Sequence, residues 1–129
     1  MDILSETECY ELLNQGQVGR VGVVVEGKQM ILPVNYATDG QSVVFKVGGL
    51  SVLAINAPMA QVAFEIDSID EVHREGWSVL FQGVAHDVTD TIDANSENLR
   101  KLDLTPWAPG EKSVWLKVTP REISGRRIP

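Results

Sequence analysis

Short runs of alternating or β-branched apolar residues recur along the chain and predict a β-sheet protein. Glycine, proline or acidic turn residues separate these runs, which is typical of antiparallel hairpins. The predicted strands are Val18–Val25, Gln29–Thr38, Ser42–Val47, Met59–Asp67, Gly76–Val88 and Ser113–Thr119, with a further extended segment at Arg121–Ile128. Short strands at this regular spacing predict a closed barrel of about six strands.

Three segments have helical patterns instead. Ser5–Gln15 opens with Ser5 and Glu8 at the spacing of a capping box and carries an apolar stripe. Ser51–Ala57 amounts to one or two apolar turns before a proline, and Thr91–Leu102 reads as a polar helix. The chain is therefore predicted to be mainly β, with two or three short helices and a single domain over residues 1–129.

Pro33 interrupts the second predicted strand. Because proline donates no ladder hydrogen bond, Pro33 predicts an edge strand or a bulge, where backbone groups are free to face a ligand. Asn35 and Tyr36 follow it, with side chains on opposite faces. In the preceding strand, Arg20 is the only charge, and two interpretations remain open: an outward surface residue, or a cation near a ligand or dimer seam.

The charge of the chain limits its partners. The formal net charge is −7 over 129 residues, which argues against nucleic acid or an anionic membrane as the main partner. Three arginines near the end, Arg121, Arg126 and Arg127, are either a solvated tail or a small anion site or subunit contact. The single cysteine, Cys9, is interpreted as a core residue and fits a cytoplasmic location. No membrane span or signal peptide is recognised.

One stretch, Phe45–Leu53, has the composition of an anion-binding turn. It places Lys46 at a strand end, then two glycines and Ser51 before a predicted helix start. Backbone N–H groups, a cation and a hydroxyl in this order hold negative charge. A phosphorylated cofactor is therefore expected to place its phosphate here.

Other chemistry has little support in the sequence. No metalloprotease, paired-cysteine, nucleophile-elbow or phosphate-loop motif is present. His73 and His86 are distant in sequence, so hydrolase and metal roles are weak interpretations. Trp77 and Trp107 are either core residues or part of a site for a flat, mostly apolar ligand.

An ordered set of motifs resembles the pyridoxamine 5′-phosphate oxidase-like proteins, which are flavin-binding split β-barrels. The motifs cover about residues 5–128 and read L-L-x4-V-G-R-V, P-V-N-Y, D-G-x-S-V-V-F-K, V-A-F-E-I-D, G-W-S-V, P-W-A-P-G and T-P-x-x-I-x-G-R-R-I. The resemblance implies a six-stranded antiparallel split β-barrel that forms a homodimer. Its flavin, FMN or in some members a deazaflavin, binds at the dimer interface. A few members bind haem instead, for which His73 or His86 would be the candidate ligand.

The same resemblance implies the residues of a flavin site. They are Pro33, Val34, Asn35 and Tyr36 beside the ring, Lys46, Val47 and Ser51 at the phosphate, and Trp77 or Trp107 near the ring or interface. A flavin-dependent oxidoreductase with an unknown substrate is the expected function, and vitamin B6 oxidation is not favoured because the basic, His-containing C-terminal motif is absent.

The phosphate segment departs from the family pattern F-R-T-x-x-G-S-K-L. Lys46 replaces arginine, Val47 replaces threonine, Leu50 replaces glycine and Val52 replaces lysine. The loss of one cation and one hydroxyl weakens a phosphate site by about 2–4 kcal/mol. The alternative function is therefore a non-catalytic dimer of the same fold with a degraded phosphate site, which binds another ligand or none.

Overall fold

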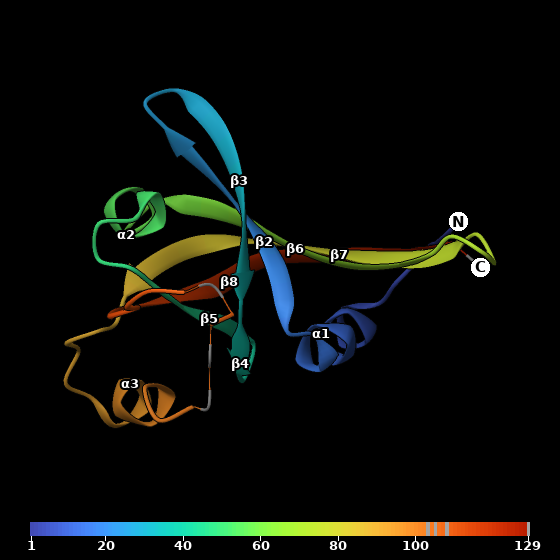
Figure 1. The fold of residues 1–129 in the computed structure, drawn as a ribbon. Coiled ribbons are helices and arrows are strands. Elements are labelled where there is room, and N and C mark those ends of the chain that lie inside the picture. The colour runs from blue at the N-terminus through green and yellow to red at the C-terminus, as the bar shows by residue number, and fades with distance from the viewer. Residues whose placement is uncertain (103, 105, 108, 129) are drawn as a thin grey trace.

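Eight β-strands form one curled antiparallel sheet in the computed structural model, which describes residues 1–102, 104, 106–107 and 109–128 (Figure 1). The strands are β1 (Asp2–Ile3), β2 (Val18–Val25), β3 (Lys28–Asn35), β4 (Ala37–Asp39), β5 (Ser42–Val47), β6 (Gln61–Asp70), β7 (Glu75–Asp87) and β8 (Val114–Ile128). The helices are α1 (Glu6–Gln15), α2 (Val52–Asn56) and α3 (Ala94–Leu99). The predicted mainly β class with short helices is confirmed, but the described residues form eight strands where six were predicted.

The two ends of the sheet meet at a single residue, Tyr36. The hydrogen-bonded order is β3-β2-β6-β7-β8-β5-β4, so β3 and β4 are the end strands, while β1 pairs with β8. Tyr36 alone separates β3 from β4 along the chain. The sheet is therefore a barrel that the covalent chain closes at Tyr36 and that stays open along the seam between β3 and β5. It is a split barrel, as the family resemblance implied, and the fully closed barrel expected from strand spacing alone is wrong.

Aromatic rings fill the inside of the barrel. Phe45, Phe64 and Phe81 are fully buried, and Tyr36 and Phe81 each meet the Phe64 ring edge-on, at centroid distances of 5.0 and 6.5 Å. A Cβ on Gly19 would lie 2.2 Å from the Phe64 ring, so this strand position requires glycine. The close neighbour at Gly19 is thus a core side chain, the Phe64 ring.

Helix α1 packs at one end of the barrel. The predicted capping box is present: the Glu8 N–H donates to the Ser5 Oγ, and the Ser5 N–H donates to the Glu8 Oε1. Burial of Cys9 and Leu13 anchors the helix to the barrel. Cys9 is thus the core residue that the sequence predicted.

Several predicted boundaries differ from the structure. The strand predicted at Gln29–Thr38 divides into β3 and β4, because the chain leaves one end of the sheet for the other at Tyr36. The segments Ser113–Thr119 and Arg121–Ile128 form one strand, β8, which absorbs Pro120 through a bulge opposite Gly83. The helix predicted at Thr91–Leu102 is shorter. In the predicted loop at 105–110, positions 105 and 108 lie outside the described residues.

Residues 68–75 lie between two strands predicted from the sequence, and here the structure has a long hairpin arm (Figure 1). Strands β6 and β7 stay paired out to Asp70 and Glu75. The Asp70 carboxylate accepts the backbone N–H groups of Val72 and His73, which closes a tight turn at the tip. These polar residues therefore form a hairpin by capping their own turn, and periodicity alone does not reveal this.

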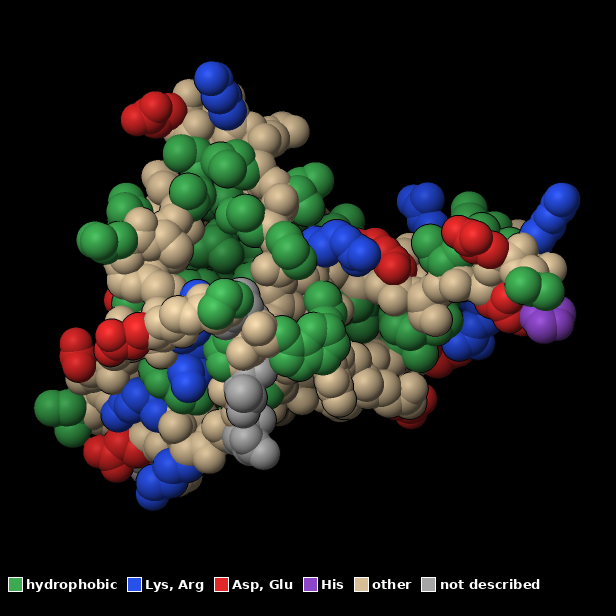
Figure 2. Space-filling view, viewed as in Figure 1, with side chains coloured by type: hydrophobic (Ala, Val, Ile, Leu, Met, Phe, Trp, Pro, Cys, Tyr) green, Lys and Arg blue, Asp and Glu red, His purple; other side chains and the backbone are tan. Residues whose placement is uncertain are grey.

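The outer face of the sheet remains largely uncovered. Exposed apolar side chains that share this face, by the strand register, are Val24, Ile31, Ile69, Leu80 and Ile128. Figure 2 shows hydrophobic side chains gathered over the β2–β3 hairpin and charges of both signs along the arm. Among the described residues, no helix has the length and apolar character needed to span a bilayer.

Candidate functional site

A groove lies at the open seam of the barrel, where β3 faces the end of β5. Its volume is about 270 Å³. The lining residues come from β3, the end of β5, the turn into α2 and the segment before β8: Leu32, Pro33, Val34, Asn35, Lys46, Val47, Gly48, Ser51, Val52, Leu53, Pro106 and Lys112. Six of the nine residues predicted for a flavin site thus line one groove: Pro33, Val34, Asn35, Lys46, Val47 and Ser51.

The seam exposes strand edges to the groove. In the described part of the chain, β3 pairs only with β2, so its other edge has no ladder partner. Strand β5 pairs with β8 on one side, and β4 covers its other edge only at Ser42–Val44. Pro33 lies in this end strand, which confirms the prediction of an edge. Free backbone groups beside apolar side chains suit a flat ligand with hydrogen-bonding groups on its rim.

Asn35 connects the groove to the loop before β8. Its Oδ1 accepts the backbone N–H of Trp107 at 2.8 Å, and its Nδ2 donates to the Gln17 carbonyl at 3.5 Å. This brings Pro106 to the groove wall. The Trp107 side chain is 70% exposed and does not line the groove. Asn35 therefore holds the loop in place, and Trp107 contributes its backbone.

Two lysines line the groove, and none of the described residues in its lining is a carboxylate. The Lys46 Nζ lies 5.1 Å from the centre of the Trp115 ring, a cation–π contact. The Lys112 Nζ donates to the Pro109 carbonyl at 3.2 Å. Both lysines are half-buried. In a chain of net charge −7, this is a local concentration of positive charge that favours an anion.

Lys112 was not among the residues predicted for the site. The pairing of Val47 with Val114 brings the segment before β8 beside the glycine turn that follows β5. A Cβ on Gly48 would lie 3.5 Å from the Glu111 carbonyl, which shows how closely this segment approaches the turn. The pairing of these two strands would have been the signal, but strand partners that are far apart in sequence are not visible in the hydrophobic pattern.

The hydroxyl of Ser51 closes the turn. It donates to the Gly48 carbonyl at 2.7 Å and accepts the Ala54 N–H at 3.2 Å, so Ser51 caps α2. Leu50 projects from the turn and is 94% exposed. The turn predicted at this point is therefore present, with its hydroxyl proton engaged inside the turn.

Tyr36 and Trp77 lie outside the groove. The Tyr36 side chain points into the core, where its hydroxyl donates to the Leu13 carbonyl at 2.6 Å. Burial raises the pKa of Tyr36 to about 12. Trp77 lines a different cavity on the arm, of about 620 Å³. Within one chain, Tyr36, Trp77 and Trp107 are thus not among the groove residues.

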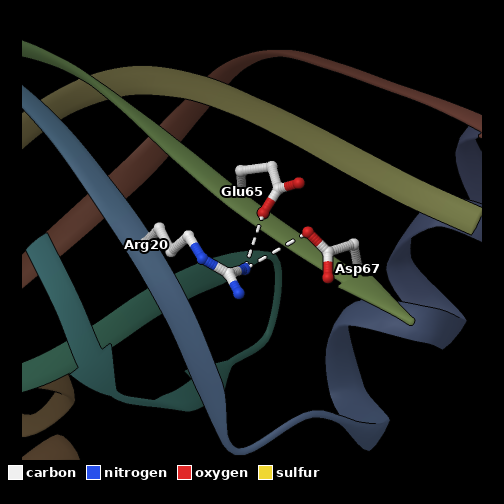
Figure 3. A network of polar contacts seen from close by, with 3 residues as sticks. All are labelled: Arg20, Glu65 and Asp67. Atoms are coloured by element: carbon white, nitrogen blue, oxygen red, sulfur yellow. Dashed lines mark hydrogen bonds and ion pairs between the residues drawn. The ribbon is translucent and has the colours of Figure 1, made fainter. Parts of the chain in front are cut away.

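An ionic cluster lies on the outer face beside the seam (Figure 3). The Arg20 Nη1 contacts the Glu65 Oε1 at 3.1 Å and the Asp67 Oδ2 at 3.2 Å. Burial is the main cause that raises the pKa of Glu65 to about 7, followed by the nearby Asp67 carboxylate; Arg20 acts in the opposite direction. Pro33 pairs with Arg20 across β2 and β3, so the groove and the cluster adjoin. Arg20 is therefore an outer-face residue, 49% exposed, next to the groove.

The histidines provide no metal site. His73 lies at the tip of the arm, where its Nδ1 is 2.7 Å from the Asp70 Oδ2. His86 lies on β7 opposite Lys117. Among the described residues, no cluster of three or more potential ligands could hold a metal ion.

Together, the curled sheet, the open seam and the groove define a split β-barrel protein with a cleft lined by two lysines. The sequence model of the pyridoxamine 5′-phosphate oxidase family matches residues 5–127, and the chain belongs to this family.

The chain is similar to proteins of several bacteria. It is 34% identical to the FAD binding protein from Mycobacterium smegmatis, with a TM-score of 0.85 over 99% of this chain and 100% of that one. An FAD-binding protein from Mesorhizobium loti shares the fold at 21% identity, with a TM-score of 0.76 over 99% of this chain and 98% of the other. Uncharacterized protein Rv3129 of Mycobacterium tuberculosis is 33% identical over 90 residues, which are 70% of this chain and 78% of that protein.

Proposed function

We propose that this chain binds a flavin nucleotide in the seam groove and acts, as a homodimer, as a flavin-dependent oxidoreductase. The observation that carries the proposal is the groove itself, which combines free strand edges, apolar walls and two lysines without a carboxylate. Family membership and the similar FAD binding protein support it. FMN is the cofactor expected from the sequence, with a deazaflavin as the alternative.

The flavin ring belongs against β3 in this proposal. Leu32, Pro33 and Val34 give the groove an apolar side, and the free edge of β3 offers backbone groups to the polar rim of the ring. The phosphate belongs at the other end, near Lys46. The Trp115 ring holds this lysine in place, so less side-chain entropy is lost when an anion binds.

A second copy of the chain would complete the site. The groove, at about 270 Å³, lies just below the roughly 300–1,000 Å³ of most small-molecule sites. The apolar outer face adjoins it at Pro33 and Arg20, so a second copy covering that face would also close the groove. The same contact could bring the arm and Trp77 of a partner copy towards the site.

A bound flavin would supply the hydride and electron transfer. The chain would orient the ring, neutralise the phosphate and exclude water. The described residues of the groove lining include no histidine, aspartate or glutamate, so a proton for the substrate would come from solvent or from groups outside these residues.

The direct test is a titration of the purified protein with FMN, FAD and a deazaflavin, followed by flavin fluorescence. Saturable quenching is expected with at least one of them. Lys46→Gln should weaken it, whereas Lys28→Gln, at the start of β3 on the exposed hairpin turn, should not. If none of the three binds at tens of micromolar, the proposal is wrong.

The turn itself favours a second candidate function, a non-catalytic dimer. Ser51 uses its hydroxyl proton on Gly48, while Val47 and Val52 offer neither hydroxyl nor charge. In this case the variant K46R/V47T/L50G/V52K should gain flavin binding that the natural chain lacks. Tight flavin binding by the natural chain would exclude this candidate.

A further inference from the structure

We propose that Lys112 is a specificity-determining residue that, together with Lys46, makes the seam groove select a flavin dinucleotide, with its diphosphate, over a flavin mononucleotide. This inference rests on the proposed function, because it concerns which flavin nucleotide the same groove takes. It assigns a role to a residue that comes from the segment before β8, outside the phosphate stretch at Phe45–Leu53.

Strand pairing fixes the position of Lys112. Val114 is the first residue of β8 and pairs with Val47, the last residue of β5. Lys112 therefore lies beside the Gly48–Gly49 turn, and both glycines bring it close. A Cβ on Gly48 would lie 3.5 Å from the Glu111 carbonyl, and one on Gly49 would lie 3.7 Å from the Ser113 Oγ. The lysine side chain then lines the groove.

The two lysines enter the groove from separate places. Lys46 pairs with Trp115, and Lys112 precedes Trp115 by three residues. Three residues of extended chain span at most about 10 Å, so the two backbones are separated by up to this distance along the groove. A single phosphate near one lysine leaves the other to act at longer range. Two linked phosphates place one phosphoryl group within reach of each lysine.

The charges point to the same ligand. In the part of the chain that the structure describes, the only contacts recorded for these ammonium groups are a ring face for Lys46 and one carbonyl for Lys112. Both are half-buried in one groove, and the part of its lining that the structure describes has no carboxylate. Two like charges in a partly desolvated groove repel each other, and an anion that contacts both relieves this repulsion. A diphosphate carries about one negative charge on each phosphoryl group and so matches the pair.

The test measures FAD and FMN dissociation constants for the full-length protein and the variant Lys112→Gln. The natural chain should bind FAD about tenfold more tightly than FMN, the size of one charge-assisted contact. Lys112→Gln should weaken FAD binding by about tenfold and FMN binding by less than threefold. Lys112→Arg should retain the preference. Lys101→Gln, an exposed lysine after α3, is the matched control and should change neither constant.

Two further measurements separate a specific role from a structural one. Inorganic pyrophosphate should compete with FAD more strongly than inorganic phosphate, and Lys112→Gln should remove this difference. The melting temperature of Lys112→Gln should match that of the natural chain, because Lys112 lies outside the helices and strands.

The outcomes distinguish this inference from the proposed function. If the natural chain binds flavins but prefers FMN, or if Lys112→Gln affects FAD and FMN equally or not at all, the role of Lys112 is wrong and flavin binding stands. If the natural chain binds no flavin, both are wrong.

Discussion

The seam groove and the arm cavity differ in both size and charge. The arm cavity is larger and its charged residues are mainly carboxylates, whereas the groove is smaller and lined by two lysines. The arm cavity is larger, about 620 Å³ against about 270 Å³. Five carboxylates and two arginines line it: Glu65, Asp67, Asp70, Glu71, Glu75, Arg74 and Arg126. The smaller groove has two lysines and no carboxylate. Size alone would select the arm as the ligand site, but for an anionic ligand the charges select the groove.

The backbone makes the same distinction. In the arm, β7 is paired on both sides, by β6 and β8, so its ladder groups are already satisfied. At the seam, one edge of β3 has no strand partner among the described residues. A ligand in the seam groove can therefore use the main chain of β3 as well as side chains. This difference matters more than volume for a flat, polar-rimmed ligand.

The largest expected effect comes from adding a carboxylate to the groove, like those that line the arm cavity. Val52→Glu adds a carboxylate to the groove lining and should weaken flavin binding by about 100-fold or more, through repulsion of the phosphate and loss of apolar contact. A glutamate is favourable in the first turn of a helix, so α2 should remain folded. Flavin fluorescence titration measures the effect.

The matched control for Val52→Glu is Ile55→Glu. Ile55 lies on the same helix but is 65% exposed and does not line the groove. The affinity of the Ile55→Glu variant for flavin should stay within about twofold of that of the natural chain. Equal losses in both variants would mean that net charge, and not the groove, governs binding.

A second prediction concerns the outer face that surrounds the arm cavity. Leu80→Asp places a charge on the apolar face and should weaken self-association by about 30-fold, since each copy would bury an unpaired carboxylate. Sedimentation analysis over a concentration series measures this. Ile92→Asp, at a 90% exposed position before α3, should leave association unchanged. Unaltered association in Leu80→Asp would show that the outer face is not the dimer contact.

Removing one cation from the groove should have a smaller effect. Lys46→Gln keeps the length of the side chain and loses its charge, so flavin affinity should fall by about tenfold. Riboflavin, which has no phosphate, should bind this variant and the natural chain equally well. A parallel loss for riboflavin would mean that Lys46 contacts the ring and not the phosphate.

The smallest expected effect is a pH dependence from the outer face. The folded pKa of Glu65 is raised from 4.5 to about 7, so the neutral form favours the folded state. Its stabilising contribution is fully present below about pH 4.5 and is lost as the pH rises through about 7. Covering Glu65 in a dimer adds to the cost of its charge, so association should weaken a few-fold from about pH 6 to 8.

The variant Glu65→Gln tests this pH dependence. It should remove most of the change in self-association between these pH values, because the amide stays neutral throughout. Asp70→Asn, on the exposed turn of the arm, should preserve the change. If Glu65→Gln retains the full pH dependence, another group is responsible.

The strands and the glycine turn after β5 were predictable because their causes are local. Alternation marked β5 and β6, a capping pair marked α1, and the glycine pair after Lys46 marked the turn. In the sequence, the open seam was indicated only by Pro33, a residue that fits a strand edge without a ladder partner. These features depend on neighbouring residues, which the sequence displays directly.

The remaining features depend on contacts between distant residues. Tyr36 was predicted to lie beside the ligand, yet its side chain fills the core, because the chain passes from one end of the sheet to the other at this residue. Lys112 reaches the groove only because β8 pairs with β5. The arm persists through polar residues because β7 also pairs with β8 there, with Gly76 opposite Ile128. Pairing partners of this kind are not visible in the local pattern of residues.

Hydrogen–deuterium exchange with and without flavin nucleotide tests the central claim most directly, because it reports where the ligand binds. Slower exchange is expected at the free edge of β3, in residues 32–35, and in the turn at residues 46–53. The V52E variant should show no change at the same ligand concentration. The arm at residues 68–77 should slow only as far as self-association increases. Protection confined to the arm cavity, or a saturating ligand that leaves both groove segments unchanged, would contradict the account.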